Sequence, residues 1–200
     1  MTDWPVRLDD GLVGLRPLRQ RDAARWRELR SANRAWLQPW EATPPDPAVP
    51  GLDFRHLVRA LAREARAGRA LPFALTYDRV MVGQLSVSGI TWGSMCSGQI
   101  GYWVSQHVAG RGIAPTAVAL ATDHCLRTMG LHRVEINIRP ENLASLRVVA
   151  KLGLRDEGVR ERFLHIDGAW RDHRTFAVTR EDLGPGGLLA RWHRAQAAAR

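Results

Sequence analysis

The stretch WVSQHVAGRGIAPT, residues 103–116, decides how the rest of the chain is interpreted. The apolar run at residues 99–104 predicts a strand. A helix is expected after the glycines, with Pro115 at its first or second position, where a missing N–H costs nothing. Gly110 and Gly112 have no Cβ, so the backbone there can approach a ligand closely. Because the first N–H groups of a helix lack partners within it, the stretch indicates a phosphate-binding site, with an ordinary turn as the alternative.

Two common nucleotide-binding motifs do not fit this loop. The run at residues 110–115 lacks the third glycine of a dinucleotide fingerprint, and no Gly-Lys-Ser or Gly-Lys-Thr follows, as a nucleotide P-loop requires. The phosphate interpretation therefore depends on the rest of the chain.

Length and composition predict one domain at residues 1–183 and a basic C-terminal tail at residues 184–200. The tail is expected either to form a helix that docks on the domain or on a second subunit, or to be disordered. No apolar run approaches the roughly 20 residues that cross a bilayer, and residues 1–7 lack the pattern of a signal peptide. Cys96 and Cys125 are too few for a disulfide framework. We therefore expect a cytoplasmic protein without membrane contact.

The net charge of +9 comes almost wholly from arginine, because Lys151 is the only lysine. One explanation is an anionic partner, such as RNA, a ribosomal surface or a phosphorylated cofactor. The other is a coding bias that favours arginine, since the arginines are scattered. No aromatic RNA-binding signature accompanies the charge, so direct nucleic-acid recognition is not predicted.

The first third of the chain predicts a strand, two helices and a loop between them. Residues 11–18 alternate as a strand does, and Asp22 suits the N-cap of a helix that runs to about Ala32. Trp36, Trp40 and Glu41 are expected on a semi-rigid loop, because prolines follow closely at positions 44, 45, 47 and 50. The next apolar pattern, residues 54–65, predicts a helix whose arginine-rich face is either solvated or an anionic docking surface.

The remainder alternates strands and helices. Strands are expected at residues 71–77, 80–92, 97–104 and 132–138, helices from the glycine loop to Gly130 and at residues 143–152, and a hairpin at residues 159–178. A helix connects the strands before and after the glycine loop, so these two should be parallel neighbours. The fold class is α+β: a mixed, mostly antiparallel sheet with one central parallel pair, flanked by helices.

Several ordered motifs carry a family resemblance. The loop AGRGIA at residues 109–114, placed after the central strand, resembles that of the GCN5-related N-acetyltransferase (GNAT) superfamily. The runs WLQPWE (36–41), HRVE (132–135), PENLAS (140–145), KLGL (151–154) and IDGAWRDH (166–173) resemble its RimJ/RimL-type branch of ribosomal-protein N-terminal acetyltransferases. The resemblance covers residues 11–181.

The resemblance implies that acetyl-CoA is the co-substrate and that its thiol arm lies in a gap between the two parallel strands. The family loop carries Arg or Gln where this chain has Ala109, which weakens one phosphate contact and keeps the backbone cradle. Trp103 and Val104 are the expected edge for stabilising an oxyanion. The full set of expected cofactor-binding residues is Tyr102, Trp103, Val104, Ala109, Gly110, Arg111, Gly112, Ile113, Ala114 and Asn142.

Three residues are candidates for the chemistry itself. The family often has a tyrosine at the position of Val149, and the branch instead uses a serine at the position of Ser145 as proton donor to the thiolate. Support of the helix start is the alternative for Ser145, and a plain N-cap is the alternative for Asn142. Glu135 and Asn137 share a strand face beside the expected gap and are candidates for the base, with purely structural roles as the alternative.

Trp36, Trp40 and Glu41 are the candidate substrate-binding residues. The tryptophans either line a substrate wall or are buried, and the carboxylate suits an ammonium group. No His, Cys or Asp cluster has metal-ligand spacing, so no metal is predicted.

The leading functional hypothesis is acetyl transfer to a protein N-terminal α-amine, of alanine or serine on a ribosomal protein. The alternatives are acetylation of a small amine, such as an antibiotic or polyamine, and a non-catalytic module that binds acyl-CoA or the ribosome. The chain is expected to be a monomer or a homodimer.

Overall fold

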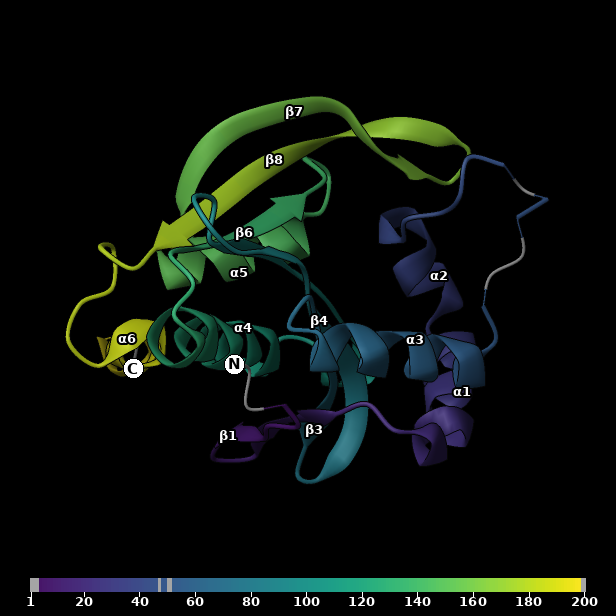
Figure 1. The fold of residues 1–200 in the computed structure, drawn as a ribbon, viewed down its shortest axis with the longest axis horizontal. Coiled ribbons are helices and arrows are strands. Elements are labelled where there is room, and N and C mark those ends of the chain that lie inside the picture. Colours follow the sequence, from purple (N-terminus) through teal and green to yellow (C-terminus); the bar gives the residue numbers. More distant parts are fainter. Residues whose placement is uncertain (1–3, 47, 50–51, 199–200) are drawn as a thin grey trace.

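One mixed sheet runs through the molecule (Figure 1). The computed structural model describes residues 4–46, 48–49 and 52–198, and within them the sheet has eight strands in the order β1-β2-β3-β4-β5-β6-β8-β7. The strands are β1 (Leu8–Asp10), β2 (Val13–Pro17), β3 (Leu71–Tyr77), β4 (Val80–Thr91), β5 (Ser97–Val104), β6 (Arg133–Ile138), β7 (Arg155–Ile166) and β8 (Ala169–Thr179).

The β5–β6 pair is parallel, and the other described pairs are antiparallel, so the expected fold class is confirmed. Alternation on β6 is as expected, with Val134, Ile136 and Ile138 buried, whereas Glu135 and Asn137 face the other way. The parallel pair requires a long crossover, which the segment between the two strands supplies.

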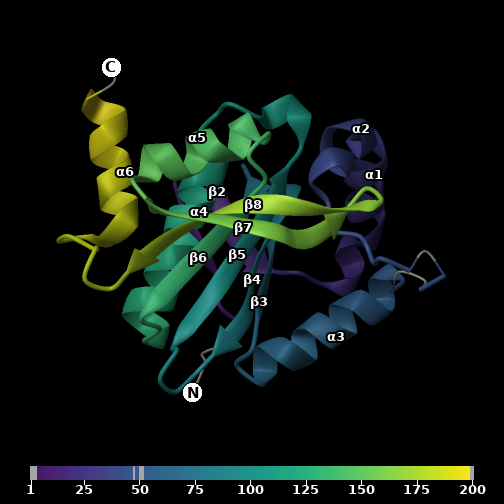
Figure 2. The same ribbon diagram turned by 90° about the horizontal axis from the view of Figure 1, so that it is seen from above.

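Helices cover both faces of the sheet (Figure 2). On one face lie α4 (Ile113–Asp123), α5 (Leu143–Leu152) and α6 (Gly187–Ala198), packed on one another and on a large apolar core. On the other lie α1 (Ala23–Ala32) and α3 (Phe54–Arg66), over a smaller cluster. The short helix α2 (Arg34–Leu37) follows α1. Short helical turns complete the set: η1 (Gln20–Asp22), η2 (Gln38–Trp40), η3 (Gln106–Val108) and the π-helical η4 (His124–Met129).

The expected loop around Trp36 and Trp40 is wrong. Trp36 lies in α2 and Trp40 in the 3-10 helix η2. Pro39 sits in the first turn of η2, where its missing N–H leaves no bond unmade, so proline starts this turn instead of preventing it. Pro44 and Pro45 lie outside helices and strands, and Pro47 and Pro50 fall outside the described residues. Pro115 is the third residue of α4, one position later than expected.

Of the alternatives for the C-terminal segment, the structure has a helix docked on the domain. Helix α6 buries Leu188 and Trp192 in the same core as α4 and α5. The Asp123 carboxylate, at the end of α4, accepts from the N–H groups of Leu188 (2.7 Å) and Leu189 (3.0 Å). This carboxylate satisfies two free donors at the start of α6.

The β7–β8 hairpin arches over the sheet and reaches the segment that follows α2 (Figure 1). At its tip Ala42 forms a β-bridge with Ile166, and the Thr43 N–H donates to the His165 carbonyl at 2.9 Å. The hairpin therefore connects the α6 end of the molecule to the tryptophan-bearing helices.

Candidate active site

The parallel strands β5 and β6 separate soon after they meet. They pair only at residues 97–99 with 133–135. Beyond this point β5 stays paired with β4 as far as Val104, and β6 stays paired with β8 as far as Ile138. The outer edge of β5 is thus left without a strand partner, as a gap that receives an extended ligand requires.

The alternation of β5 decides which backbone groups face this gap. Ser105, just after the strand, donates its N–H to the Val82 carbonyl on the β4 side at 2.8 Å. Alternate residues direct their N–H and C=O groups to opposite edges, so the backbone of Trp103 also faces β4, and those of Tyr102 and Val104 face the gap. The expected oxyanion edge therefore shifts from Trp103 and Val104 to Tyr102 and Val104.

A cavity of about 460 Å³ opens at this point. Its wall comes from α2, η2, β5, the glycine loop, the start of α4 and one side of α5 as far as Lys151. It brings together most of the expected residues: Trp36, Trp40, Tyr102, Trp103, Val104, Ala109, Gly110, Gly112, Ile113, Ala114, Asn142 and Ser145. Arg111, Glu41, Glu135 and Asn137 are not part of this wall.

The glycine loop presents unpaired amides to the cavity. Gly110 (φ +83°) and Gly112 (φ +77°) adopt left-handed conformations that turn the loop into α4. The first helical bond runs from the Thr116 N–H to the Gly112 carbonyl at 3.2 Å. Among the described residues the N–H groups at positions 110–114 have no hydrogen-bond acceptor. This cradle fits a diphosphate.

Helix α6 supports the loop from behind. The Trp192 indole donates to the Thr116 hydroxyl at 2.9 Å, and a Cβ on Gly112 would lie 3.4 Å from the Gln196 amide nitrogen. The loop conformation therefore depends on a helix that lies far away in sequence.

Two cations, which the sequence motifs did not mark as site residues, line the cavity from α5. Arg147 and Lys151 are four residues apart and share one helix face. In the part of the chain that the structure describes, neither forms an ion pair, although the Lys151 ammonium lies 5.9 Å from the centre of the Trp192 ring. Two features of the sequence could have identified these residues: their spacing after Asn142, and the fact that Lys151 is the only lysine. They bring positive charge to a loop that has Ala109 in place of a cation.

Two hydroxyls meet at the start of α5. The Asn142 side chain accepts from the Ser145 N–H at 3.1 Å, which caps the helix and fixes Ser145 in its first turn. The Tyr102 hydroxyl is buried and makes no ordinary hydrogen bond to a described residue. Burial raises the pKa of Tyr102 to about 12, and the neighbouring Ser145 hydroxyl opposes this shift.

The tryptophan end of the cavity is held by arginine and carbonyl contacts. The Trp36 indole donates to the Val104 carbonyl at 3.1 Å. The Arg139 guanidinium lies 5.5 Å from the centre of the Trp40 ring and donates to the Pro39 carbonyl at 2.7 Å. Both tryptophans are thus part of the cavity wall. Glu141, which sequence reasoning missed, contributes a carboxylate to the same wall.

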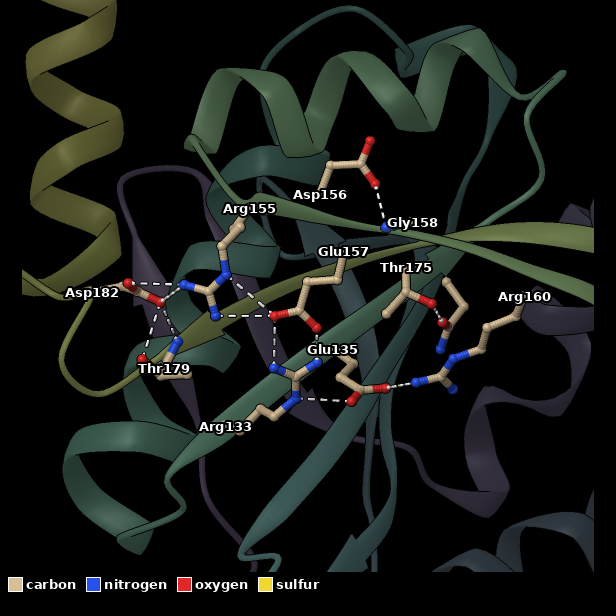
Figure 3. Close-up of polar contacts among 11 residues, drawn as sticks. Arg133, Glu135, Arg155, Asp156, Glu157, Gly158, Arg160, Thr175, Thr179 and Asp182 are labelled. Atoms are coloured by element: carbon tan, nitrogen blue, oxygen red, sulfur yellow. Dashed lines mark hydrogen bonds and ion pairs between the residues drawn. The ribbon is translucent and has the colours of Figure 1, made fainter.

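Three of the four expected residues outside the cavity wall, Glu41, Glu135 and Asn137, form contacts with other side chains. Glu41 pairs with Arg30. Glu135 lies between Arg133 (2.8 Å) and Arg160 (2.9 Å) on the outer face of the sheet (Figure 3). Glu135 and Asn137 do not line the cavity, and side chains of β6 itself and of neighbouring strands supply their partners. A role for either residue as the base stays a prediction.

The Asn137 side chain donates to the side-chain amide oxygen (Oε1) of Gln99 at 3.3 Å and accepts from the Thr175 hydroxyl at 2.8 Å. Over the described ranges, no group of three His, Cys, Asp or Glu side chains has the arrangement of a metal site. No helix in those ranges has the length and apolar character needed to cross a membrane.

Comparison with known proteins gives consistent results. Residues 13–155 match the acetyltransferase (GNAT) domain family. The chain is 30% identical over 183 residues to the [ribosomal protein uS5]-alanine N-acetyltransferase of Escherichia coli, covering 90% of this chain and 94% of that protein.

Two solved structures are similar over nearly the whole chain. RimJ of Mycobacterium smegmatis, solved in complex with CoA-disulfide, is 40% identical with a TM-score of 0.89, covering 96% of both chains. The ribosomal-protein-S5-alanine acetyltransferase of Vibrio fischeri is 26% identical with a TM-score of 0.79, covering 90% of this chain and 100% of that chain.

Proposed function

We infer the activity of this chain from the premise that it belongs to the GNAT acetyltransferase family: it is an acetyl-CoA-dependent N-acetyltransferase, and its acceptor is the N-terminal α-amine of a ribosomal protein. Alanine is the first choice for the acceptor residue, because the Escherichia coli relative is named for alanine of protein uS5. Serine is the second choice.

The observation that carries the proposal is the gap between β5 and β6, which ends at the unpaired amides of residues 110–114. A thiol arm that enters the gap meets the backbone of Tyr102 and Val104, and a diphosphate meets the glycine loop. Arg147 and Lys151 add charge where Ala109 adds none. Acetyl-CoA carries both groups, a thiol arm with the acetyl group at one end and a diphosphate at the other, so each end meets the part of the site that suits it.

In this proposal the chain accelerates the reaction chiefly by positioning. The amine attacks the thioester carbonyl, and holding the two reactants in line removes most of the entropic cost. The Val104 N–H, directed into the gap, is placed to stabilise the oxyanion. Ser145 donates to the sulfur as the C–S bond breaks. A free α-amine has a pKa near 8, so a fraction is neutral at pH 7 without a strong base.

The acceptor end is the wall made by Trp36, Trp40 and Glu141. Indole faces suit the peptide backbone next to the amine, and the carboxylate suits its ammonium form. Glu141 takes the role expected for Glu41, because Glu141 lines the cavity and Glu41 does not. The Glu141 carboxylate also accepts from Arg139 at 3.1 Å, which fixes it at this end of the cavity.

The test is release of free thiol from acetyl-CoA with a panel of acceptors. Turnover is expected with peptides that begin with alanine or serine, and none with the same peptides carrying a blocked N-terminus. Turnover with polyamines or aminoglycosides alone would indicate the small-amine alternative. Tight acetyl-CoA binding without turnover on either set would indicate a non-catalytic module.

A further inference from the structure

The Tyr102 hydroxyl is buried and has no hydrogen-bond partner among the described residues. Tyr102 itself lines the cavity. Three buried side-chain atoms in the described residues lack a hydrogen bond, on Tyr102, Thr122 and Arg171, and only Tyr102 lines the cavity. Buried polar groups are almost always paired, so an unpaired one next to a binding site calls for an explanation.

The Ser145 hydroxyl is the polar neighbour of this group. Ser145 lines the same cavity, and it is the side chain whose hydrogen bonding opposes the burial effect on the Tyr102 pKa. Tyr102 comes from β5 and Ser145 from the first turn of α5, so two different elements contribute the two hydroxyls. Ser145 is therefore the candidate acceptor for the Tyr102 O–H, which has no other hydrogen-bond partner among the described residues.

The Tyr102 and Ser145 hydroxyls differ in burial, and this difference indicates different roles for them. Ser145 is half-buried and faces the cavity, whereas the Tyr102 oxygen is sealed from solvent. The pKa of Tyr102, raised to about 12, keeps its proton in place at neutral pH, so Tyr102 is available only as a donor or a neutral acceptor. Because the Asn142 cap already fixes the Ser145 backbone, only the direction of the Ser145 O–H remains to be set.

We propose that Tyr102 is a positioning residue that donates its hydrogen bond to the Ser145 oxygen and thereby directs the Ser145 O–H at the sulfur of the leaving thiolate. As the C–S bond breaks, its electron pair stays on sulfur. Ser145 gives its proton to the sulfur and takes one from water, while the amine releases one proton to water. The products are the amide and the free thiol, and Tyr102 is unchanged throughout.

The inference rests on the proposed function and is tested with Tyr102→Phe, which removes one oxygen atom. With acetyl-CoA and an alanine peptide, kcat should fall about tenfold, the size of one hydrogen bond, with KM for acetyl-CoA unchanged within about twofold. The melting temperature should change little, because the half-buried Ser145 oxygen can accept from water when the Tyr102 hydroxyl is removed. Tyr77→Phe, at the only other tyrosine, is the matched control and should leave all three values unchanged.

The decisive comparison uses the Ser145→Ala background. If Tyr102 acts through Ser145, then Tyr102→Phe causes no further loss of kcat there. An additive loss in the double variant, or a lowered melting temperature with equal losses in kcat and affinity, would overturn the proposal.

A second readout does not depend on the acceptor. The pKa of the bound CoA thiol, followed by the ultraviolet absorbance of its thiolate, should be about one unit higher in Tyr102→Phe and in Ser145→Ala than in the wild type. An unchanged thiol pKa in Tyr102→Phe would refute the positioning role. If the wild type lacks turnover but the thiol pKa shifts as expected, the proposed acceptor is wrong and the hydroxyl pair stands.

Discussion

Lys151 and Arg147 form a cationic wall on the α5 side of the cavity. Lys151→Met keeps the aliphatic stem near Trp192 and removes the charge, so Kd for CoA should rise roughly fivefold, as for one partly exposed ion pair. The change should shrink at high salt, because screening weakens the wild-type contact. Titration calorimetry at two salt concentrations measures both effects.

Arg59→Met on α3 is the matched control for Lys151→Met. It also removes one surface cation but lies on a helix that contributes nothing to the described cavity. If both variants weaken CoA binding equally, the effect comes from net charge, and the role of Lys151 as a phosphate contact is wrong.

Gly112 is the residue at which backbone conformation and ligand contact coincide. With φ at +77°, Gly112→Ala should lower the free energy of unfolding by about 1–2 kcal/mol. The added methyl also obstructs close approach to the loop, so Kd for CoA should rise roughly tenfold. Urea unfolding and calorimetry provide the two numbers.

Gly168→Ala separates strain from binding. Gly168, at the tip of the β7–β8 hairpin, has φ at +79° and open space around its Cβ position. It should show a similar loss of stability with unchanged CoA affinity. Weaker CoA binding in both variants would show that general destabilisation, not the loop, controls affinity.

Among the elements, those with local signals were predicted well from sequence. Asn142 and Gly153 mark the two ends of α5 as expected, because a side-chain cap and a left-handed glycine are properties of a few adjacent residues. Strand β1 was missed, since three residues carry too little pattern and its pairing with β2 is what defines it. Helix α2 was missed because the prolines at positions 44, 45, 47 and 50 were interpreted as excluding a helix over the whole segment, whereas α2 ends at Leu37, before all of them.

The site shows the same division between local and non-local information. Alternation along β6 predicted correctly that Glu135 and Asn137 share a face. It could not show that Arg160, from β7, occupies that carboxylate, because pairing between distant strands is not encoded locally. The sequence likewise could not predict toward which edge of β5 the Trp103 N–H and C=O groups point, since this depends on the register between β4 and β5.

Helix α6 gives an element-scale prediction through its N-terminal carboxylate. Asp123→Ala removes both acceptors from the start of α6 and should cost about 1 kcal/mol of stability. Because α6 carries Trp192 and Gln196 behind the glycine loop, CoA binding should weaken as well. Thermal unfolding with and without CoA measures the linkage, since bound ligand should raise the melting temperature less than in the wild type.

Asp53→Ala is the matched control for Asp123→Ala. Asp53 caps α3 by accepting from the His56 N–H at 2.9 Å, on the opposite face of the sheet. It should lower stability by a similar amount and leave CoA affinity intact. An equal loss of affinity in Asp53→Ala would contradict a specific role for α6.

At the scale of the whole molecule, charged side chains bind the far strands of the sheet together (Figure 3). Glu157 on β7 pairs with Arg133 on β6 and with Arg155, and Arg155 pairs with Asp182 beyond β8 at 3.1 Å. The hydrogen bond from Arg133 is the largest cause that lowers the pKa of Glu157, from 4.5 to about 2. This network ties the root of the β7–β8 hairpin to the strand that forms one side of the gap.

The lowered pKa of Glu157 sets the direction of its pH effect. Below pH 4.5 the unfolded chain takes up a proton that the folded protein binds only near pH 2, so the stabilisation from Glu157 is present above this window and is lost as pH falls through it. In Glu157→Gln the free energy of unfolding should therefore depend less steeply on pH between about 4.5 and 2. Urea unfolding at intervals from pH 2 to 7 measures the slope. Glu161→Gln on the same strand, where the structure describes no ion pair, should keep the wild-type slope, and an equally flat curve there would rule out the network as the cause.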